Sequence, residues 1–195
     1  MNMVRAFIAI DLSPAIQAKL QELLMQLKDR MPGLPVRWVP AQNIHLTLKF
    51  LGEVSVSNLT VLQQSLQQEV AAHRSFEVVV EGLGVFPSYR RPKVIWVGLS
   101  APQELVTLQK RIEQEAERLG YSREDRGFTP HLTLGRVSRN ANTAEIHRIG
   151  ESVERYEVNT LGSMIVSQVK LYKSDLQPGG AIYTCLYTET LKEFI

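Results

Sequence analysis

The feature that most constrains the fold is an internal repeat. The tetrapeptide His-Leu-Thr-Leu occurs at residues 45–48 and again at 131–134, 86 positions later. A Leu-Ser pair that precedes a proline-capped helical pattern occurs at residues 12–13 and 99–100, 87 positions apart. Two separate landmarks with nearly equal offsets indicate duplication rather than chance. The repeat therefore predicts two similar lobes, each with a sheet and with helices on its outer face.

Each repeat contains strands and helices in the same order. Apolar runs and alternation predict strands, whereas apolar residues at helical spacing predict helices. The predicted strands cover residues 4–11, 36–39, 44–51, 76–85, 94–99, 131–137, 164–171 and 181–189. The predicted helices begin at Ser13-Pro14, near Ser57, at Pro102 and at Thr143. No linker rich in Gly, Pro and Ser separates the repeats, so we expect residues 1–195 to form one domain of two lobes.

The two His-Leu-Thr-Leu strands are each expected to have a polar and an apolar face. Residues two apart on a strand share a face, so His45, Thr47 and Lys49 point one way and the leucines point the other. In the second copy His131 and Thr133 share the polar face. A dry core would not accept these polar groups without partners. We therefore expect both polar faces to line one cleft between the lobes.

Two residues that follow the motifs test this alternation. The same parity places Phe50 and Arg136 on the leucine faces. A charged arginine is not expected on a face that packs against the core. The second strand is therefore predicted to bulge or end near Gly135.

The paired histidines indicate acid–base chemistry on a phosphate. With an ordinary pKa near 6.5, one neutral imidazole can activate water or a ribose hydroxyl while a protonated one donates to the leaving oxygen. Threonine hydroxyls two residues away can hold the non-bridging phosphate oxygens. A single histidine on a strand is more often structural, but two of the four histidines lie in identical tetrapeptides. His73 and His147 lack this context and are interpreted as structural or surface residues.

Several other function classes lack support. Neither motif has a neighbouring carboxylate, and there is no His-Glu-x-x-His pattern, so we expect no metal. No phosphate-binding loop or Gly-x-Ser-x-Gly elbow is present. The only cysteine, Cys185, lies in an apolar run and is predicted to be buried and inert. The net charge of +2, from 22 basic and 20 acidic residues, is too small to indicate binding of duplex DNA.

Composition also limits the expected location. The chain has 195 residues, 44% of them hydrophobic, which is enough for a real core. No run of about 18 apolar residues could cross a membrane. The first residues lack the pattern of a signal peptide. We therefore expect a cytoplasmic protein without a membrane segment.

Three segments together resemble the two-histidine (2H) phosphoesterases. These are residues 5–11 (RAFIAID), 38–54 around the first motif, and 128–136 (FTPHLTLGR). They are most similar to the bacterial and archaeal RNA 2′,3′-cyclic phosphodiesterase branch, historically called 2′-5′ RNA ligase. The resemblance covers most of the chain up to about residue 137. It implies a bilobal α+β fold in which a cleft separates two pseudo-symmetric lobes, each with a mainly antiparallel sheet and outer helices.

The resemblance also implies an activity and roles for residues. It implies hydrolysis of a ribose 2′,3′-cyclic phosphate at an RNA or tRNA-fragment end, which leaves a 2′-phosphate. His45 would donate a proton to the 3′ leaving oxygen, and His131 would activate water. Thr47 and Thr133 would hold the phosphate. No cofactor or metal is implied, and we expect a monomer.

Further substrate contacts and other functions stay open. The candidate contacts with the terminal nucleotide are the cationic or aromatic residues Arg90, Arg91, Arg126 and Phe128. One alternative is a ligase that joins a 2′,3′-cyclic end to a 5′-hydroxyl. Others are a non-catalytic RNA-binding module and an enzyme for a small cyclic nucleotide or ADP-ribose cyclic phosphate.

Overall fold

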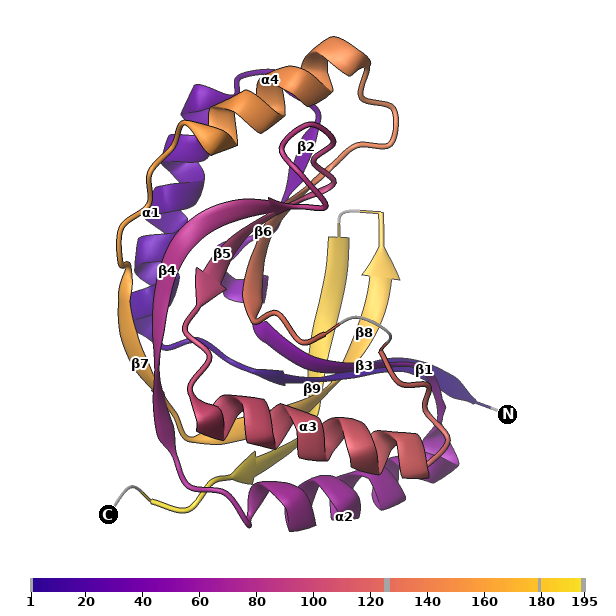
Figure 1. The fold of residues 1–195 in the computed structure, drawn as a ribbon. Helices are drawn as coiled ribbons and strands as arrows, with labels where there is room; N and C mark the ends of the chain where they lie inside the picture. The colour runs from indigo at the N-terminus through magenta and orange to yellow at the C-terminus, as the bar shows by residue number, and fades with distance from the viewer. Residues whose placement is uncertain (1, 125–126, 179, 194–195) are drawn as a thin grey trace.

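The computed structural model describes residues 2–124, 127–178 and 180–193 (Figure 1). Its strands are β1 (Met3–Ile10), β2 (Val36–Trp38), β3 (Leu46–Ser55), β4 (Phe76–Phe86), β5 (Val94–Leu99), β6 (His131–Val137), β7 (Gly162–Val166), β8 (Gln168–Gln177) and β9 (Gly180–Thr190). Its α-helices are α1 (Pro14–Arg30), α2 (Leu59–Val70), α3 (Gln103–Arg118) and α4 (Thr143–Glu154). Short 3₁₀ helices cover Ala41–Asn43 and Val56–Asn58. None of these helices has the length and apolar character needed to cross a membrane.

All strands belong to one sheet, in the order β7-β4-β5-β6-β3-β1-β8-β9, with β2 paired to β6. The two motif strands, β3 and β6, meet in the middle at the single antiparallel pair Leu46–Leu132. These leucines occupy equivalent positions of the repeat. The pair therefore divides the sheet into one half with β7, β4, β5, β6 and β2 and another with β3, β1, β8 and β9, which confirms the predicted two-lobed α+β architecture.

The helices cross between the halves. Helix α3, from the second repeat, contacts β3 in the first half, and Gln109 donates a hydrogen bond to the Leu48 carbonyl (3.3 Å). Helix α1, from the first repeat, contacts β7, and α4 contacts β4. Figure 1 shows α1 and α4 together at one end of the molecule and α2 and α3 together at the other. Each half is therefore completed by a helix from the other repeat, so neither half has its full core alone.

Local sequence explains where the helices begin. The Ser13 hydroxyl accepts a hydrogen bond from the Ile16 amide (3.4 Å), and Pro14 occupies the first turn of α1. The apolar face of α1 is buried, as predicted. Helix α4 begins with a capping box: the Asn142 side chain accepts a hydrogen bond from the Glu145 amide (3.0 Å), and the Glu145 carboxylate accepts one from the Asn142 amide (2.7 Å). The prediction that Ser57 caps α2 was wrong, because the chain makes a 3₁₀ turn at Val56–Asn58 first.

The prediction of one strand over residues 164–171 was also wrong. The segment forms β7, which pairs with β4, and β8, which pairs with β1 in the other half of the sheet. Met164 and Val166 are buried, and the next buried residue is Val169. The alternation therefore changes phase between residues 166 and 169, and the chain leaves one half of the sheet for the other there.

A one-residue bulge follows each motif threonine. Opposite the continuous β1, strand β3 skips Leu48, so that Thr47 pairs with Ala9 and Lys49 with Ile8. Opposite the continuous β5, strand β6 skips Leu134 in the same way. The bulge predicted near Gly135 is thus confirmed, and its equivalent at Leu48 was not predicted.

These bulges reverse the expected alternation beyond each motif. Lys49 is buried, with 1% of its surface exposed, and does not share the face of His45 as predicted. Phe50, predicted to face the core, is 51% exposed. Arg136 is likewise exposed. The residues that follow the bulges therefore exchange faces in both strands.

The buried Lys49 is the centre of a polar network. Its ammonium donates to the carboxylate of Glu113 on α3 and to the carbonyl of Ser122. The Glu124 amide donates to the same Glu113 carboxylate (3.0 Å), and Gln109 donates to its second oxygen (3.2 Å). The network thus connects β3 to α3 and to the segment that leads into β6.

This network predicts a large effect of removing one partner. Lys49→Met leaves the Glu113 carboxylate buried without its counter-ion, which should lower the free energy of unfolding by about 3–5 kcal/mol. The double variant Lys49→Met, Glu113→Leu should recover much of that loss. Urea unfolding of the two single variants and the double variant measures the coupling.

The partly exposed ion pair Lys173–Asp175 (2.9 Å) is a matched control. Lys173→Met should change the free energy of unfolding by less than about 1 kcal/mol, because water screens exposed pairs. Equal losses in Lys49→Met and Lys173→Met would contradict the role given to the buried network.

Candidate functional site

The two motifs bring four polar side chains to one face of the sheet. Extending the Leu46–Leu132 register by one residue in each direction places His45 opposite Thr133 and Thr47 opposite His131. All four side chains are half-buried, and both leucines are fully buried on the other face. We call the face that carries the histidines the open face. The predicted grouping of His45, Thr47, His131 and Thr133 is therefore consistent with the pairing of the strands.

Both imidazoles are held in the same way. Nδ1 of His45 lies 2.9 Å from the Asn43 carbonyl, and Nδ1 of His131 lies 2.7 Å from the Thr129 carbonyl. A carbonyl oxygen can only accept a hydrogen bond, so Nδ1 carries a proton in both rings. Nε2 of each ring is then the atom left to exchange a proton with a ligand.

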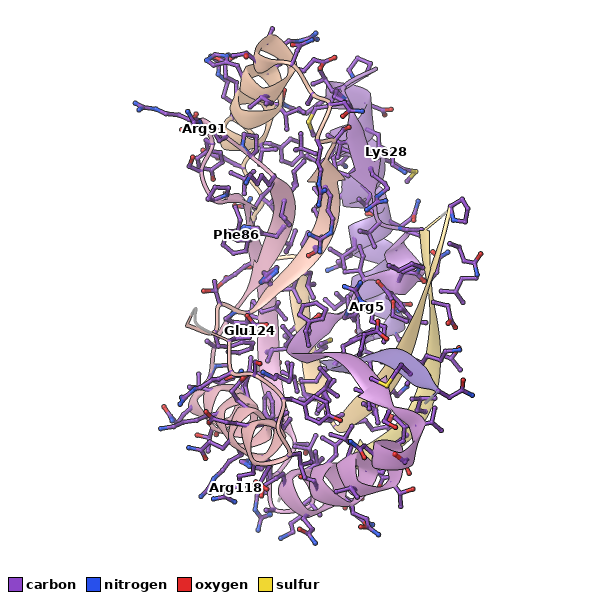
Figure 2. The ribbon with its side chains drawn as sticks, turned by 90° about the vertical axis from the view of Figure 1, so that its right-hand side faces the viewer. Arg5, Lys28, Phe86, Arg91, Arg118 and Glu124 are labelled. Carbon is purple, nitrogen blue, oxygen red and sulfur yellow. The ribbon has the colours of Figure 1, made fainter. Side chains whose placement is uncertain are left out.

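The surroundings of the two rings differ. Phe7 stacks on His45 with ring centroids 4.7 Å apart, and Tyr183 contacts the same ring edge-on at 5.2 Å. His131 has an edge-on contact with Phe86 at 5.0 Å. Phe86 lies on β4, in the half of the sheet that contains β6 (Figure 2). Identical tetrapeptides therefore place their histidines in different aromatic environments.

Burial lowers the pKa of His45 below its ordinary value of 6.5. The hydrogen bond to Asn43 and the negative charge of Asp11 oppose this shift. Asp11 itself accepts a hydrogen bond from the Tyr172 hydroxyl (2.8 Å) and pairs with Lys170 (2.6 Å). Free His45 therefore favours the neutral form, and Asp11 moderates that preference.

Two arginines that were not assigned to the site approach the open face. Burial raises the pKa of Tyr183, and the positive charges of Arg136 and Arg5 oppose that rise. The Tyr183 ring contacts His45 edge-on, so these two charges act on a group beside the first motif. Residue alternation alone places Arg5 on the open face, because Arg5 shares a strand face with Phe7. Arg136 reaches this face only because β6 bulges at Leu134.

The other predicted substrate contacts are more scattered. Arg90 and Arg91 are exposed in the turn between β4 and β5, and Figure 2 shows Arg91 at the end of the molecule that carries α4. Phe128 is half-buried and packs against the core. Arg126 lies outside the described residues. Their contacts with substrate stay predictions.

Cys185 is exposed, so the prediction that it is buried was wrong. It lies opposite Tyr172 in the β8–β9 hairpin, where Ile182 is also 56% exposed and Leu176 is 68% exposed. An apolar run in an edge hairpin need not be covered by a helix. His147, in contrast, is a surface residue as predicted and lies 3.5 Å from Glu151.

Metal ligands do not gather at this site. Among the described residues, no three His, Cys, Asp or Glu side chains are grouped so that they could hold a metal ion. Metal independence stays a prediction about the reaction.

Comparisons with known proteins agree on one family. The model of the LigT-like phosphoesterase family matches twice, over residues 10–96 and 97–183. The RNA 2′,3′-cyclic phosphodiesterase of Methanothermobacter thermautotrophicus is 34% identical over 181 residues, which are 93% of this chain and 95% of that protein. The protein of the same name from Thermotoga maritima is 33% identical and covers 94% of each chain.

Solved structures give the same result. The crystal structure of Escherichia coli LigT with 3′-AMP is 27% identical, with a TM-score of 0.78, and the match covers 97% of this chain and 99% of that one. A Thermus thermophilus protein is 26% identical with a TM-score of 0.81, over 97% and 98% of the two chains. The similarity therefore extends over both halves of the sheet.

The lowered pKa of His45 predicts how stability depends on pH. Because its pKa is lower in the folded chain than the unfolded value of 6.5, the unfolded chain binds more protons as the pH falls. The contribution of neutral His45 to the free energy of unfolding is then fully present above pH 6.5. It is lost as the pH falls toward the pKa of His45 in the folded chain. His45→Gln should flatten this loss between about pH 7 and pH 5, as measured by urea unfolding at each pH.

His147→Gln is the control, because the His147 side chain is 70% exposed. It should leave the pH dependence close to that of the wild type. A wild-type pH dependence in His45→Gln would contradict the assignment of this loss of stability to His45.

Proposed function

Because the chain belongs to the LigT-like phosphoesterase family, we propose that it hydrolyses RNA 2′,3′-cyclic phosphate ends and leaves a 2′-phosphate. The observation that carries this proposal is the pair of imidazoles on one face, each with Nδ1 bonded to a carbonyl and with Nε2 left to exchange a proton. A threonine lies opposite each histidine in the extended register. This arrangement suits a reaction in which one oxygen attacks phosphorus and another leaves.

The reaction requires one proton acceptor and one proton donor. We assign His131 as the base: its neutral Nε2 takes a proton from water as the water oxygen forms a bond to phosphorus. His45 is the acid: its protonated Nε2 gives a proton to the 3′ oxygen as the bond from phosphorus to that oxygen breaks. The product carries a 2′-phosphate and a 3′-hydroxyl. Exchange of protons with solvent then restores both rings.

Thr47 and Thr133 hold the phosphate in this mechanism. Their hydroxyls lie on the open face and can donate to non-bridging oxygens, where negative charge grows in the transition state. Arg136 adds a positive charge on the same side of the sheet. The threonines fix the position of phosphorus.

The acid role of His45 depends on the substrate. Burial favours the neutral ring in the free protein. A bound phosphate brings a negative charge beside Nε2, which favours the protonated form. The substrate therefore supports the protonation state that the reaction needs.

Other parts of the proposal concern the protein as a whole. We propose that residues 1–195 act as one domain of two duplicated lobes, as a metal-independent monomer in the cytoplasm. The exchange of α1 and α3 between the halves supports a single domain. Ligation to a 5′-hydroxyl end is a competing reaction with an alcohol in place of water, and product analysis separates the two.

Single histidine variants test the mechanism directly. With a short RNA that ends in a 2′,3′-cyclic phosphate, in EDTA, His45→Ala and His131→Ala should each lower kcat by about 10²–10⁴-fold, since each removes one proton-transfer group. Chromatography that separates 2′- from 3′-phosphate measures both the rate and the direction of ring opening.

His147→Ala is the matched control and should retain wild-type turnover. Retained activity in either motif variant would overturn the two-histidine mechanism. Loss of wild-type activity in EDTA, restored by a divalent ion, would show that a metal is required.

The pH dependence of kcat/KM provides a second test. A bell-shaped profile is expected, because one histidine must be neutral and the other protonated in the free enzyme. The limb that reports His45 should lie below pH 6.5, because burial lowers its pKa. Asp11→Asn removes a charge that raises this pKa and should shift the same limb to lower pH.

Asp175→Asn changes a partly exposed carboxylate that pairs with Lys173 and should leave both limbs in place. A profile that stays flat between about pH 5 and pH 8 would count against a pair of titrating histidines.

A further inference from the structure

A pair of arginines extends the open face away from the histidines. In the antiparallel pairing of β2 with β6, Arg37 lies directly opposite Arg136. Both residues are exposed. Side chains directly opposite each other in a ladder share a face, so the two guanidinium groups lie on the same side of the sheet.

The neighbours of Arg37 show which side this is. A Cβ on Gly135 would meet Val36 Cγ1 at 2.9 Å and Trp38 Cε3 at 3.0 Å, so both side chains lie on the face that Gly135 presents. Arg37 lies between them in β2 and must point to the other face. That face carries Arg136, which adjoins Thr133 beyond the Leu134 bulge. Arg37 therefore belongs to the open face.

This arrangement places two like charges side by side. Like charges directly opposite in a ladder repel each other. In the part of the chain that the structure describes, the ion pairs involve neither Arg37 nor Arg136. An anion that bridges the two guanidinium groups would turn this repulsion into attraction, and arginine is suited to bind phosphate through two parallel hydrogen bonds.

We infer that Arg37 and Arg136 bind the phosphodiester that joins the terminal nucleotide to the one before it. This inference rests on the proposed function, because it places the cyclic phosphate between the histidines. With a strand rise of about 3.3 Å per residue, the Cα atoms of Thr133 and Arg136 lie about 7–10 Å apart. Consecutive phosphates along an RNA strand have a comparable separation. The substrate class is therefore an RNA of two or more nucleotides rather than a cyclic mononucleotide.

Three substrates separate this site from the catalytic centre. They are adenosine 2′,3′-cyclic phosphate, the dinucleotide ApA with a 2′,3′-cyclic end, and the same dinucleotide with an uncharged methylphosphonate linkage. For the wild type, kcat/KM should be about tenfold or more higher with the charged than with the uncharged linkage, as expected for charge-assisted hydrogen bonds. Arg37→Gln should lower that ratio to near one.

Arg111→Gln is the matched control, because Arg111 is an exposed arginine on α3, at the other end of the molecule from β2 (Figure 1). It should leave the ratio unchanged. Arg37→Gln should unfold at the same temperature as the wild type or a higher one, because it removes a like-charge contact. Arg37→Lys should give an intermediate ratio, since lysine keeps the charge but not the paired hydrogen bonds.

The outcomes distinguish the two proposals. Hydrolysis of both dinucleotides at equal kcat/KM by the wild type would overturn the upstream site and leave the proposed function intact. An unchanged ratio in Arg37→Gln would also overturn the upstream site. No hydrolysis of any of the three substrates by the folded wild type would overturn the proposed function and the upstream site together.

Discussion

The arrangement of the site depends on one bulge in each motif strand. Before the bulge, strict alternation places histidine and threonine on the open face and a leucine in the core. Without the bulges at Leu48 and Leu134, alternation would place Lys49 on the open face and Arg136 in the core. The extra residue buries the lysine, where Glu113 pairs with it, and exposes the arginine. The bulge at Leu48 thus places a lysine in the core, and the bulge at Leu134 places an arginine on the open face.

The two halves are coupled by more than the central leucine pair. The Lys49–Glu113 network joins the first motif strand to the segment at residues 122–124, which leads toward the second motif. Thr129, farther along that segment, provides the carbonyl that holds His131. Helices from each repeat also cover the other half. Contacts between the two repeats therefore hold the two histidines in position relative to each other.

Much of the fold and the central site could be predicted because the information is local. The repeat, the apolar periodicity and the alternation around His45 and His131 are properties of neighbouring residues. The burial of Lys49 was missed because it depends on which residue of β3 has no partner in β1. The roles of Phe7, Tyr183 and Arg37 depend on the pairing of distant strands, which no local pattern shows. Cys185 was misjudged because an apolar run does not reveal whether a helix covers it.

Symmetry also explains why the two histidines can differ. Duplication gives both imidazoles a hydrogen bond from Nδ1 to the backbone carbonyl two residues earlier and leaves Nε2 of each to exchange a proton. The difference comes from strands outside the motifs: β1 and β9 supply Phe7 and Tyr183 to His45, whereas β4 supplies Phe86 to His131. A single acid–base pair needs two protonation states at one pH. Identical motifs set the geometry of proton transfer, and the unequal outer strands give the two rings different surroundings. Burial keeps His45 neutral in the free protein, so the charge of the bound phosphate is what favours its acid form.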